Sequence, residues 1–246
     1  MFVCCERFIC TYENKVTRAR KFRRIVQLET ALSYEAEEYV EAIYKLQKRG
    51  GVAKTTELAE ELHVVPGSIT NTIEHLEKHG LVKHEPYKGV RLTAKGERLA
   101  LDILRRHRLA ERLLTDILDF KWSDVHESAC KLEHALTKDV VTLLEKKLEN
   151  PKFCPHGNPI PTGNGEVEEE ECCLLTEVGL NVTCIVAKVT DEKREKLLTL
   201  ANVGIKPNVS ICVVKKKTST MVLRVAGKER ALSYDNASGV WVKQKR

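Results

Sequence analysis

Residues 68–82, SITNTIEHLEKHGLV, carry the signals of one amphipathic helix that ends sharply. Ile69, Ile73 and Leu76 recur at helical spacing, Ser68 is the expected N-cap and Gly80 the expected C-cap. A VPG turn precedes this helix, and before the turn KTTELAEELHV (54–64) predicts a shorter helix. Two helices joined by such a turn indicate a helix-turn-helix unit.

The flanking segments extend this unit. SYEAEEYVEAIYKLQKRG (33–50) predicts a first helix with Ser33 as its N-cap. KHEPYKGVRLTAKG (83–96) predicts two short strands around a turn at Tyr87–Gly89. Three helices followed by a hairpin are typical of a winged helix-turn-helix domain, which binds DNA. The alternative is a three-helix packing unit with a solvated polar face.

The predicted recognition helix presents small polar side chains where bases are contacted. Asparagine can pair with adenine through two hydrogen bonds, and serine and threonine hydroxyls can bond bases or phosphates. Histidine and lysine further along, and a lysine in the wing, would reach the phosphate backbone. The expected DNA-binding residues are Thr55, Gly67, Ser68, Thr70, Asn71, His75, Lys78 and Lys88.

Bulk charge adds little to this prediction. The net charge is +6, but residues 31–150 carry nineteen Lys/Arg against twenty-one Asp/Glu. The excess lies at the ends, with seven against three in residues 1–30 and fifteen against eleven in residues 151–246. Local geometry, rather than net charge, therefore supports DNA binding.

The rest of the chain predicts two further domains. ERLALDILRRHRLAERLLTDIL (97–118) and two shorter helical segments predict a helical domain, and a proline-, glycine- and glutamate-rich segment then marks a linker. Alternating strands and one helix at 192–203 predict a small β-barrel. We therefore expect an α+β chain with a basic, flexible arm at 1–30, a winged helix-turn-helix domain at 31–96, a helical domain at 97–150, a linker at 151–172 and the barrel at 173–246.

The expected location is the cytoplasm. No apolar run approaches the roughly 18 residues that a membrane span needs. The first ten residues, MFVCCERFIC, are too short and too charged for a signal-peptide core. The nine cysteines are therefore expected as reduced thiols, in the core or as metal ligands.

HESACKLEH (126–134) concentrates residue types that bind metals. On a helix, His126, Cys130, Glu133 and His134 fall within an arc of roughly 100°. The preceding helix adds a histidine and a glutamate four residues apart, which share one face. Imidazole, thiolate and carboxylate together suit a borderline ion such as Fe(II), Zn(II), Co(II) or Ni(II). Burying these groups without an ion would be costly, so the pattern predicts a metal site rather than a polar surface helix.

Several motifs together resemble one known family. They are EYVEAIY (38–44), HRLAERLLTD (107–116), HESACKLEH (126–134) and GNPIP (157–161). The chain resembles the diphtheria-toxin-repressor family of iron- or manganese-dependent transcriptional repressors. The resemblance implies a repressor that dimerises through residues 97–150, binds double-stranded operator DNA, and ends in an SH3-like third domain.

The resemblance also implies two ligand sets. The activating site would use Glu38, Cys130, Glu133 and His134, and a second site would use His107, Glu111 and His126. Cys154 and His156 would join Glu111 where manganese-type members bind a second ion. Arg108 and Asn158 match residues that hold an anion in iron-type members, although Cys154 replaces a serine there. Glu192 and Glu195 lie on the helix from which the third domain lends ligands.

The implied cofactor is Fe(II), with Mn(II) as the alternative. Cys130 is the iron-type choice, whereas Glu38 and Glu41 match carboxylate ligands of manganese-type members. Co(II), Ni(II) or Zn(II) are expected to bind in vitro. Two other hypotheses stay open: a metalloenzyme whose winged helix only dimerises, and a constitutive architectural DNA binder without a metal. No catalytic residue is expected, because ligands that bridge domains favour regulation over hydrolysis.

Overall fold

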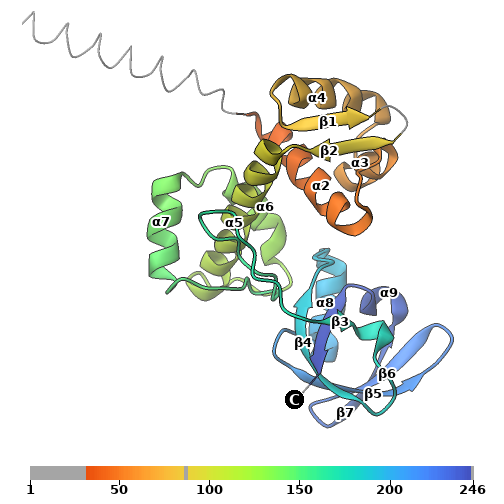
Figure 1. Cartoon of the computed structure of the whole chain (residues 1–246). Helices are drawn as coiled ribbons and strands as arrows, with labels where there is room; N and C mark the ends of the chain where they lie inside the picture. Colours follow the sequence, from red (N-terminus) through yellow and green to blue (C-terminus); the bar gives the residue numbers. More distant parts are fainter. Residues whose placement is uncertain (1–31, 86–87, 245–246) are drawn as a thin grey trace, which may run out of the picture.

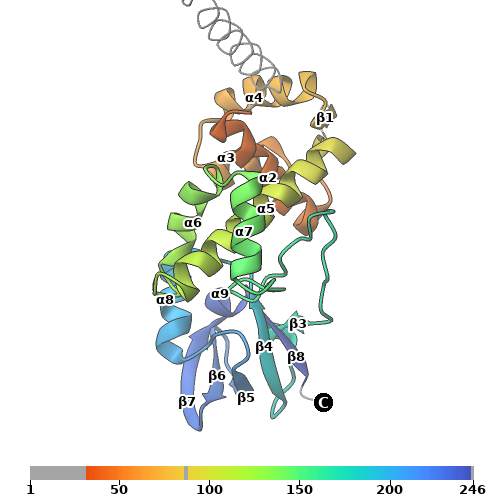
Figure 2. The same ribbon diagram turned by 90° about the vertical axis from the view of Figure 1, so that its left-hand side faces the viewer.

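The computed structural model describes residues 32–85 and 88–244, which form three regions along one elongated body (Figures 1 and 2). The expected arm, with Cys4, Cys5 and Cys10, and Tyr87 of the expected turn lie outside the described residues. The first region contains helices α2 (Tyr34–Gly50), α3 (Thr55–Leu62) and α4 (Pro66–Lys78) and the antiparallel strands β1 (Val82–Glu85) and β2 (Gly89–Leu92). This is the order expected of a winged helix-turn-helix domain.

The ends of the helices follow from capping residues. Ser33 caps α2 as expected, since its hydroxyl accepts a hydrogen bond of 3.2 Å from the Ala36 N–H. The expected cap at Ser68 is wrong. Helix α4 begins two residues earlier, with Pro66 at its first position, because the fixed φ of proline suits that position. Ser68 therefore lies inside the helix, where its hydroxyl donates to the Val65 carbonyl.

Helix α5 (Ala94–Asp116) joins the first two regions. Thr93 caps it, so the helix begins at Ala94, three residues before the expected start at Glu97. Ala100 and Ile103 pack into the core of the first region, while Leu109 and Leu114 pack into a second core with α6 (Val125–Glu133) and α7 (Lys138–Lys147). One rigid helix thus serves both cores, and it links the orientation of the winged helix to the helical region.

The segment after α7 is only partly exposed, although the sequence predicted a linker from 151 to 172. Residues 154–161 form a continuous stretch in which only Pro155 is not buried. The Val189 N–H donates to the His156 carbonyl at 2.8 Å, which joins this segment to the third region. Consecutive glutamates further along pair with lysines, at 3.0 Å for Glu168–Lys152 and 2.8 Å for Glu169–Lys188.

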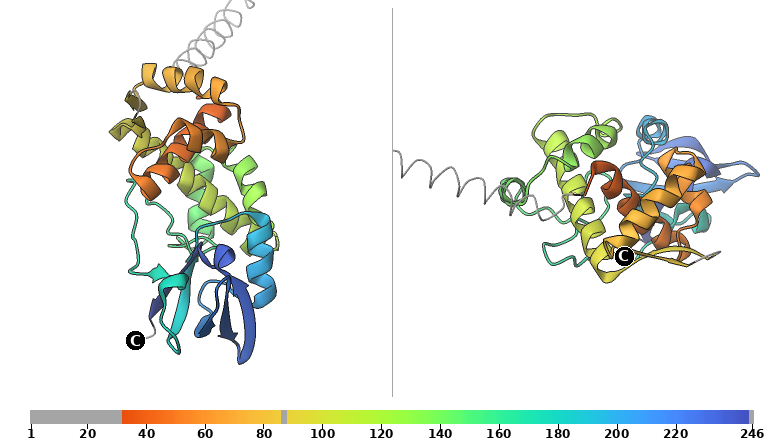
Figure 3. Two further views of the ribbon diagram at one scale, coloured as in Figure 1. Left: turned by 90° about the vertical axis from the view of Figure 1, so that its right-hand side faces the viewer. Right: turned by 90° about the horizontal axis from the view of Figure 1, so that it is seen from above.

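The third region is a six-stranded antiparallel sheet in the order β3-β8-β4-β5-β6-β7. Its strands are β3 (Cys173–Leu174), β4 (Thr183–Val189), β5 (Ser210–Lys216), β6 (Thr220–Val225), β7 (Lys228–Ser233) and β8 (Val240–Gln244). A short turn η1 (Leu175–Glu177) and helices α8 (Arg194–Val203) and α9 (Tyr234–Ala237) accompany it, and α8 lies along one side (Figure 3). Register shifts in β4 and β5 bend the sheet.

Within residues 32–85 and 88–244, no helix is long and apolar enough to cross a membrane.

Candidate metal centre

Helices α5 and α6 pack together and bring the predicted ligands of both into one buried cluster. The His107 ring lies between two carboxylates, with Nδ1 at 2.6 Å from Glu133 Oε2 and Nε2 at 3.2 Å from Glu111 Oε1. Cys130 Sγ lies 3.7 Å from His126 Nε2 and 3.9 Å from His107 Nδ1. His107 therefore lies at the centre of the cluster, in contact with residues that the resemblance assigned to two separate sites.

The loop after α7 and the start of the third region complete the cluster. His156 Nδ1 lies 3.0 Å from Glu111 Oε1, and its Nε2 donates to the Trp122 carbonyl at 3.0 Å. Glu192 enters from the third region, with Oε2 at 3.2 Å from His126 Nδ1. Glu192 precedes α8 rather than lying on it, which frees its side chain to reach the helical region.

Three overlapping groups place one ligand atom per residue within 4.8 Å of one another. The first contains a thiol and two imidazoles, and the other two join the α5 carboxylate to the third region. They are His107–His126–Cys130, His107–Glu111–His126–Glu192 and Glu111–Cys154–His156–Glu192. The sets implied by the resemblance are therefore partly regrouped. Cys130 lies nearest to the two histidines, and Cys154 and His156 join Glu111 as the resemblance implied.

The histidines of the cluster hold protons tightly. Burial by itself lowers the pKa of His126, but hydrogen bonds with Cys130, Glu111 and Glu192 raise this pKa to about 12. Burial also lowers the pKa values of His107 and His156, but the Glu111 carboxylate together with hydrogen bonds from neighbouring side chains outweighs it and holds both well above 6.5. A metal ion binding here must replace these protons, since it needs a free imidazole lone pair.

Three acidic groups of the cluster have lowered pKa values. Burial raises the pKa of Glu111, but His156 and His107 outweigh it and hold that pKa well below 4.5. The pKa of Glu192 falls to about 2, because the histidines that face it outweigh both burial and the neighbouring Glu111 carboxylate. The pKa of the Cys130 thiol is lowered, because hydrogen bonds with His107 and His126 outweigh burial. These three groups are thus favoured as anions, the forms that bind a cation, whereas burial raises the pKa values of Glu133 and of the Cys154 thiol.

The remaining implied ligands lie at the edge of this cluster. Glu38 is exposed, and it lines a cavity of about 300 Å³ together with Glu41, His126, Cys130 and Glu133. His134 Nε2 lies 3.5 Å from Glu133 Oε1. The neighbour of Glu38 on α2, Glu37, contacts the other nitrogen of that ring, with Oε2 at 2.7 Å from His134 Nδ1. Glu37 carried no signal in the sequence analysis, because its role depends on how α2 packs against α6.

The donor set fits a metal ion. Glu111 Oε2 and His134 Nε2 are buried, yet neither makes a hydrogen bond within the described part of the chain. Buried polar atoms are ordinarily satisfied, and an unpaired one calls for an explanation such as a bound ion. Both atoms belong to residues that the sequence analysis named as metal ligands. The unpaired atoms and the mixture of nitrogen, oxygen and sulfur donors together favour a transition metal.

Three further predicted residues have other contacts. Arg108 donates to the Pro159 carbonyl, and Asn158 donates to the Val189 carbonyl at 2.8 Å and to Glu192 Oε1 at 2.7 Å. Their donors therefore hold the loop and Glu192 in place, and an anion would have to compete with these bonds. Glu195 is exposed and belongs to none of the ligand groups found among the described residues, unlike Glu192.

Most of the predicted DNA-binding side chains are exposed on α4. Gly67, Thr70, Asn71, His75 and Lys78 are exposed along α4. Thr55 and Ser68 are half-buried, and Lys88 in the wing is exposed and pairs with Glu85 at 3.4 Å. Val65, just before α4, has the largest exposed fraction among the exposed large apolar side chains of the described residues, 72%. Among the described residues, helix α4 lies at the end of the molecule opposite the six-stranded sheet (Figure 2).

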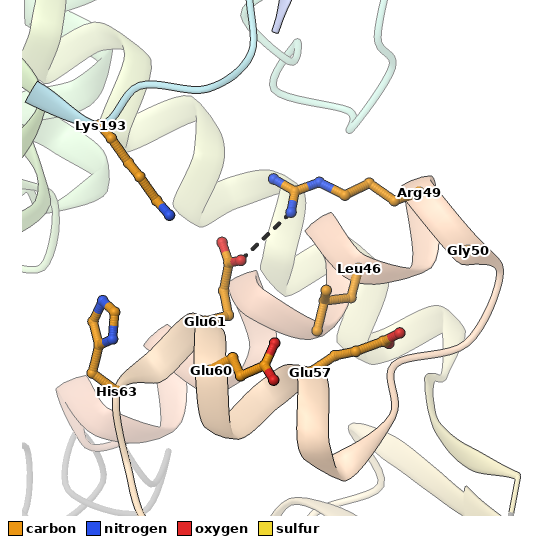
Figure 4. Close-up of a pocket in the computed structure, with 8 residues that line it drawn as sticks. All are labelled: Leu46, Arg49, Gly50, Glu57, Glu60, Glu61, His63 and Lys193. Carbon is orange, nitrogen blue, oxygen red and sulfur yellow. Dashed lines mark hydrogen bonds and ion pairs between the residues drawn. The ribbon is translucent and has the colours of Figure 1, made fainter. Parts of the chain in front are cut away.

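A second cavity, of about 540 Å³, lies where the third region approaches α3. Figure 4 shows Lys193 pointing toward Glu61 and His63, while Arg49 of α2 pairs with Glu61 at 3.5 Å. Glu57 and Glu60 add further carboxylates to its wall. Lys193 directly follows Glu192, so the same short loop faces both the cluster of donor side chains around His107 and the helix-turn-helix.

Comparisons with known proteins match this architecture. Residues 31–90 match the family described as "Iron dependent repressor, N-terminal DNA binding domain", and residues 93–162 match its "metal binding and dimerisation domain". Residues 173–244 match the FeoA domain. The "Iron-dependent repressor IdeR" of Mycobacterium leprae is 32% identical over 221 residues, which cover 85% of this chain and 96% of that protein.

Solved structures agree with this likeness. A structure described as "Manganese-dependent transcriptional repressor complex with manganese" superposes with a TM-score of 0.78 at 29% identity, over 85% of this chain and all of that one. The structure of IdeR from T. acidophilum gives 0.73 at 29% identity, over 85% of this chain and 97% of that one. The chain belongs to the iron-dependent repressor family, whose members are metal-dependent transcriptional repressors.

Proposed function

We propose that this protein is a dimeric repressor that binds operator DNA when Fe(II) occupies the centre between α2, α5, α6 and the Glu192 loop. The single observation that carries the proposal is the buried cluster around His107, in which donors from α5, α6, the loop after α7 and the third region meet. A bound cation would supply positive charge and Lewis acidity at a point where those regions join. The bound cation would therefore act by setting the positions of those regions relative to one another.

Fe(II) is favoured by the softer donors. Cys130 and Cys154 offer thiol sulfur and three histidines offer imidazole nitrogen, all of which suit iron better than manganese. Mn(II) is the second candidate, because Glu38 and Glu41 line the same cavity as Cys130 and offer hard oxygen donors. The regulated genes would then be those of iron or manganese homeostasis.

The proposed coupling between metal binding and DNA binding depends on which helices carry the donors. Helix α2 belongs to the winged helix-turn-helix, whereas α6 belongs to the helical region. An ion that favours one arrangement of the two would set the angle of α4 relative to the body. In a dimer, this angle fixes the distance between the two recognition helices, which must match the spacing of the two half-sites.

The helical region offers a surface for the second copy. Large apolar side chains are exposed at the end of α5, in the following loop and on α7, and Leu143 is 69% exposed. Such a concentration is typical of a protein interface. The residues are Ile117, Leu118, Phe120, Val140 and Leu143. The proposed setting is the cytoplasm, where chromosomal DNA is accessible.

A gel shift on the DNA upstream of the protein's own gene tests the proposal. We expect binding with Fe(II) under anaerobic conditions, weaker binding with Mn(II), and none with a chelator. Replacing both Glu133 and His134 by alanine should abolish the metal-dependent shift while circular dichroism stays unchanged. Equal binding with and without metal would instead indicate a constitutive DNA binder. Metal binding and dimerisation without any DNA shift would favour the metalloenzyme hypothesis.

A further inference from the structure

Glu37 of α2 sits behind the His134 ring, on the side away from Glu133. Its carboxylate oxygen Oε2 lies 2.7 Å from His134 Nδ1, and the other oxygen, Oε1, accepts a hydrogen bond of 3.1 Å from Arg106. The side chains of Glu37, Arg106 and His134 are 16%, 9% and 6% exposed. The three groups therefore form a largely dry, charged network between α2, α5 and the end of α6.

This geometry determines which nitrogen of His134 can bind an ion. A carboxylate only accepts hydrogen bonds, so His134 Nδ1 must carry the hydrogen that joins it to Glu37. In the neutral ring the lone pair then lies on Nε2. Nε2 is buried without a hydrogen bond and lies 3.5 Å from Glu133 Oε1. For two donors bound at about 2.0–2.1 Å in a tetrahedral site, the expected separation is about 3.4 Å, so this pair is already close to ligand geometry.

Arg106 links this arrangement to the ligand helix. One guanidinium nitrogen donates to Glu37, and a second donates to the Glu133 carbonyl at 3.0 Å, at the last residue of α6. The ring of Tyr34 lies on His134, with ring centroids 5.0 Å apart. Two residues of α2 and one of α5 thus fix the ring orientation and the backbone that carries both ligands.

We infer that Glu37 is a positioning residue of the metal centre, which orients His134 so that Nε2 faces Glu133 and which ties helix α2 to that centre. The inference rests on the proposed function, because it assumes that Glu133 and His134 bind the ion. A carboxylate that accepts from the far nitrogen of a metal-binding histidine fixes its ring and makes it a better ligand. Here that carboxylate comes from the DNA-binding region, so ligand orientation and the position of α2 depend on each other.

The test is Glu37→Gln in the full chain, with Glu35→Gln as the matched control. Glu35 lies two residues away on the same helix and is exposed, so the same change there leaves the network intact. Co(II) serves as the probe, followed by its visible absorption and, in parallel, by the DNA gel shift. We expect the Co(II) midpoint of Glu37→Gln to rise about 10–100-fold, which is the usual cost of losing such a partner. Glu35→Gln should titrate like the unaltered chain.

Two readouts separate positioning from a merely structural role. At excess Co(II), DNA binding by Glu37→Gln should reach the same plateau as the unaltered chain, whereas a damaged fold would lower that plateau. Ring ¹⁵N NMR of the unaltered, metal-free chain should show the neutral His134 ring protonated on Nδ1. Equal Co(II) midpoints for the two glutamine variants, a lowered plateau, or a proton on Nε2 would overturn the inference. The proposed function fails separately, if the unaltered chain binds DNA equally with and without Co(II).

Discussion

Replacing Gly157 by alanine should weaken the docking of the third region against the cluster of donor side chains around His107. Gly157 has φ of +83°, and a Cβ atom there would lie 2.1 Å from the Ala187 carbonyl oxygen and 2.9 Å from the Lys188 Cα. Both clashes are with the backbone of β4, which cannot rotate away as a side chain can. Glu192 follows β4 along the chain, so displacing this strand also displaces a donor of the cluster.

Two costs set the size of the effect. The left-handed backbone conformation costs an L-residue about 1–2 kcal/mol. Forcing extra atoms into a packed contact adds about 1–3 kcal/mol. Together they predict that docking of the third region weakens by roughly 2–5 kcal/mol. The control is Gly179→Ala, where the nearest atom to an added Cβ is the flexible Val182 Cγ2 at 3.6 Å.

Tryptophan fluorescence can follow this docking. Trp122 Nε1 donates to the Pro155 carbonyl at 2.8 Å, and its ring lies 5.0 Å from that of His156 and 5.6 Å from Lys206 Nζ in the third region. In a Trp241→Phe background, Trp122 becomes the only tryptophan. Urea unfolding should then show a lower midpoint for Gly157→Ala than for Gly179→Ala. Equal midpoints would refute the reasoning, because they would mean that the loop and β4 separate without cost.

Three further predictions concern DNA, the dimer and protons. Asn71→Ala should weaken binding to the cognate operator by about 1–3 kcal/mol and relax specificity at one base, as measured by gel shifts on single-base variants. Leu143→Asp should shift the protein toward monomer in analytical ultracentrifugation, with thermal stability changed only slightly, because Leu143 is 69% exposed within one chain. The folded pKa of His126 is raised to about 12, so its proton stabilises the ion-free fold fully below about pH 6.5, and that stabilisation is lost as the pH rises toward 12. Metal affinity should therefore increase with pH between about pH 6 and 8, as calorimetric Co(II) titrations at several pH values would show.

Local sequence signals predicted which helices form better than they predicted the residues at which those helices begin. The Ile69–Ile73–Leu76 stripe predicted α4, because burial at helical spacing needs only neighbouring residues. The start of α4 was missed because Ser68 resembles a cap, whereas Pro66 supplies the first helical φ. Glu192 was placed on a helix, but α8 begins at Arg194. Capping depends on the backbone geometry of one or two residues, which hydrophobic periodicity does not report.

The sequence alone determined which residue types could bind a metal and that α5 and α6 would present them on single faces. His107 and Glu111, four residues apart, and the histidine, cysteine and glutamate of HESACKLEH could be found from helical spacing. Only the tertiary structure decided how these donors are grouped and what supports them. Glu192 reaches His126 across a domain boundary, and Glu37 rather than Glu38 contacts His134, because the angles at which α2 and β4 pack against the helical region set those distances. Spacing along one helix fixes directions around that helix, but contacts between distant segments depend on packing that no local pattern encodes.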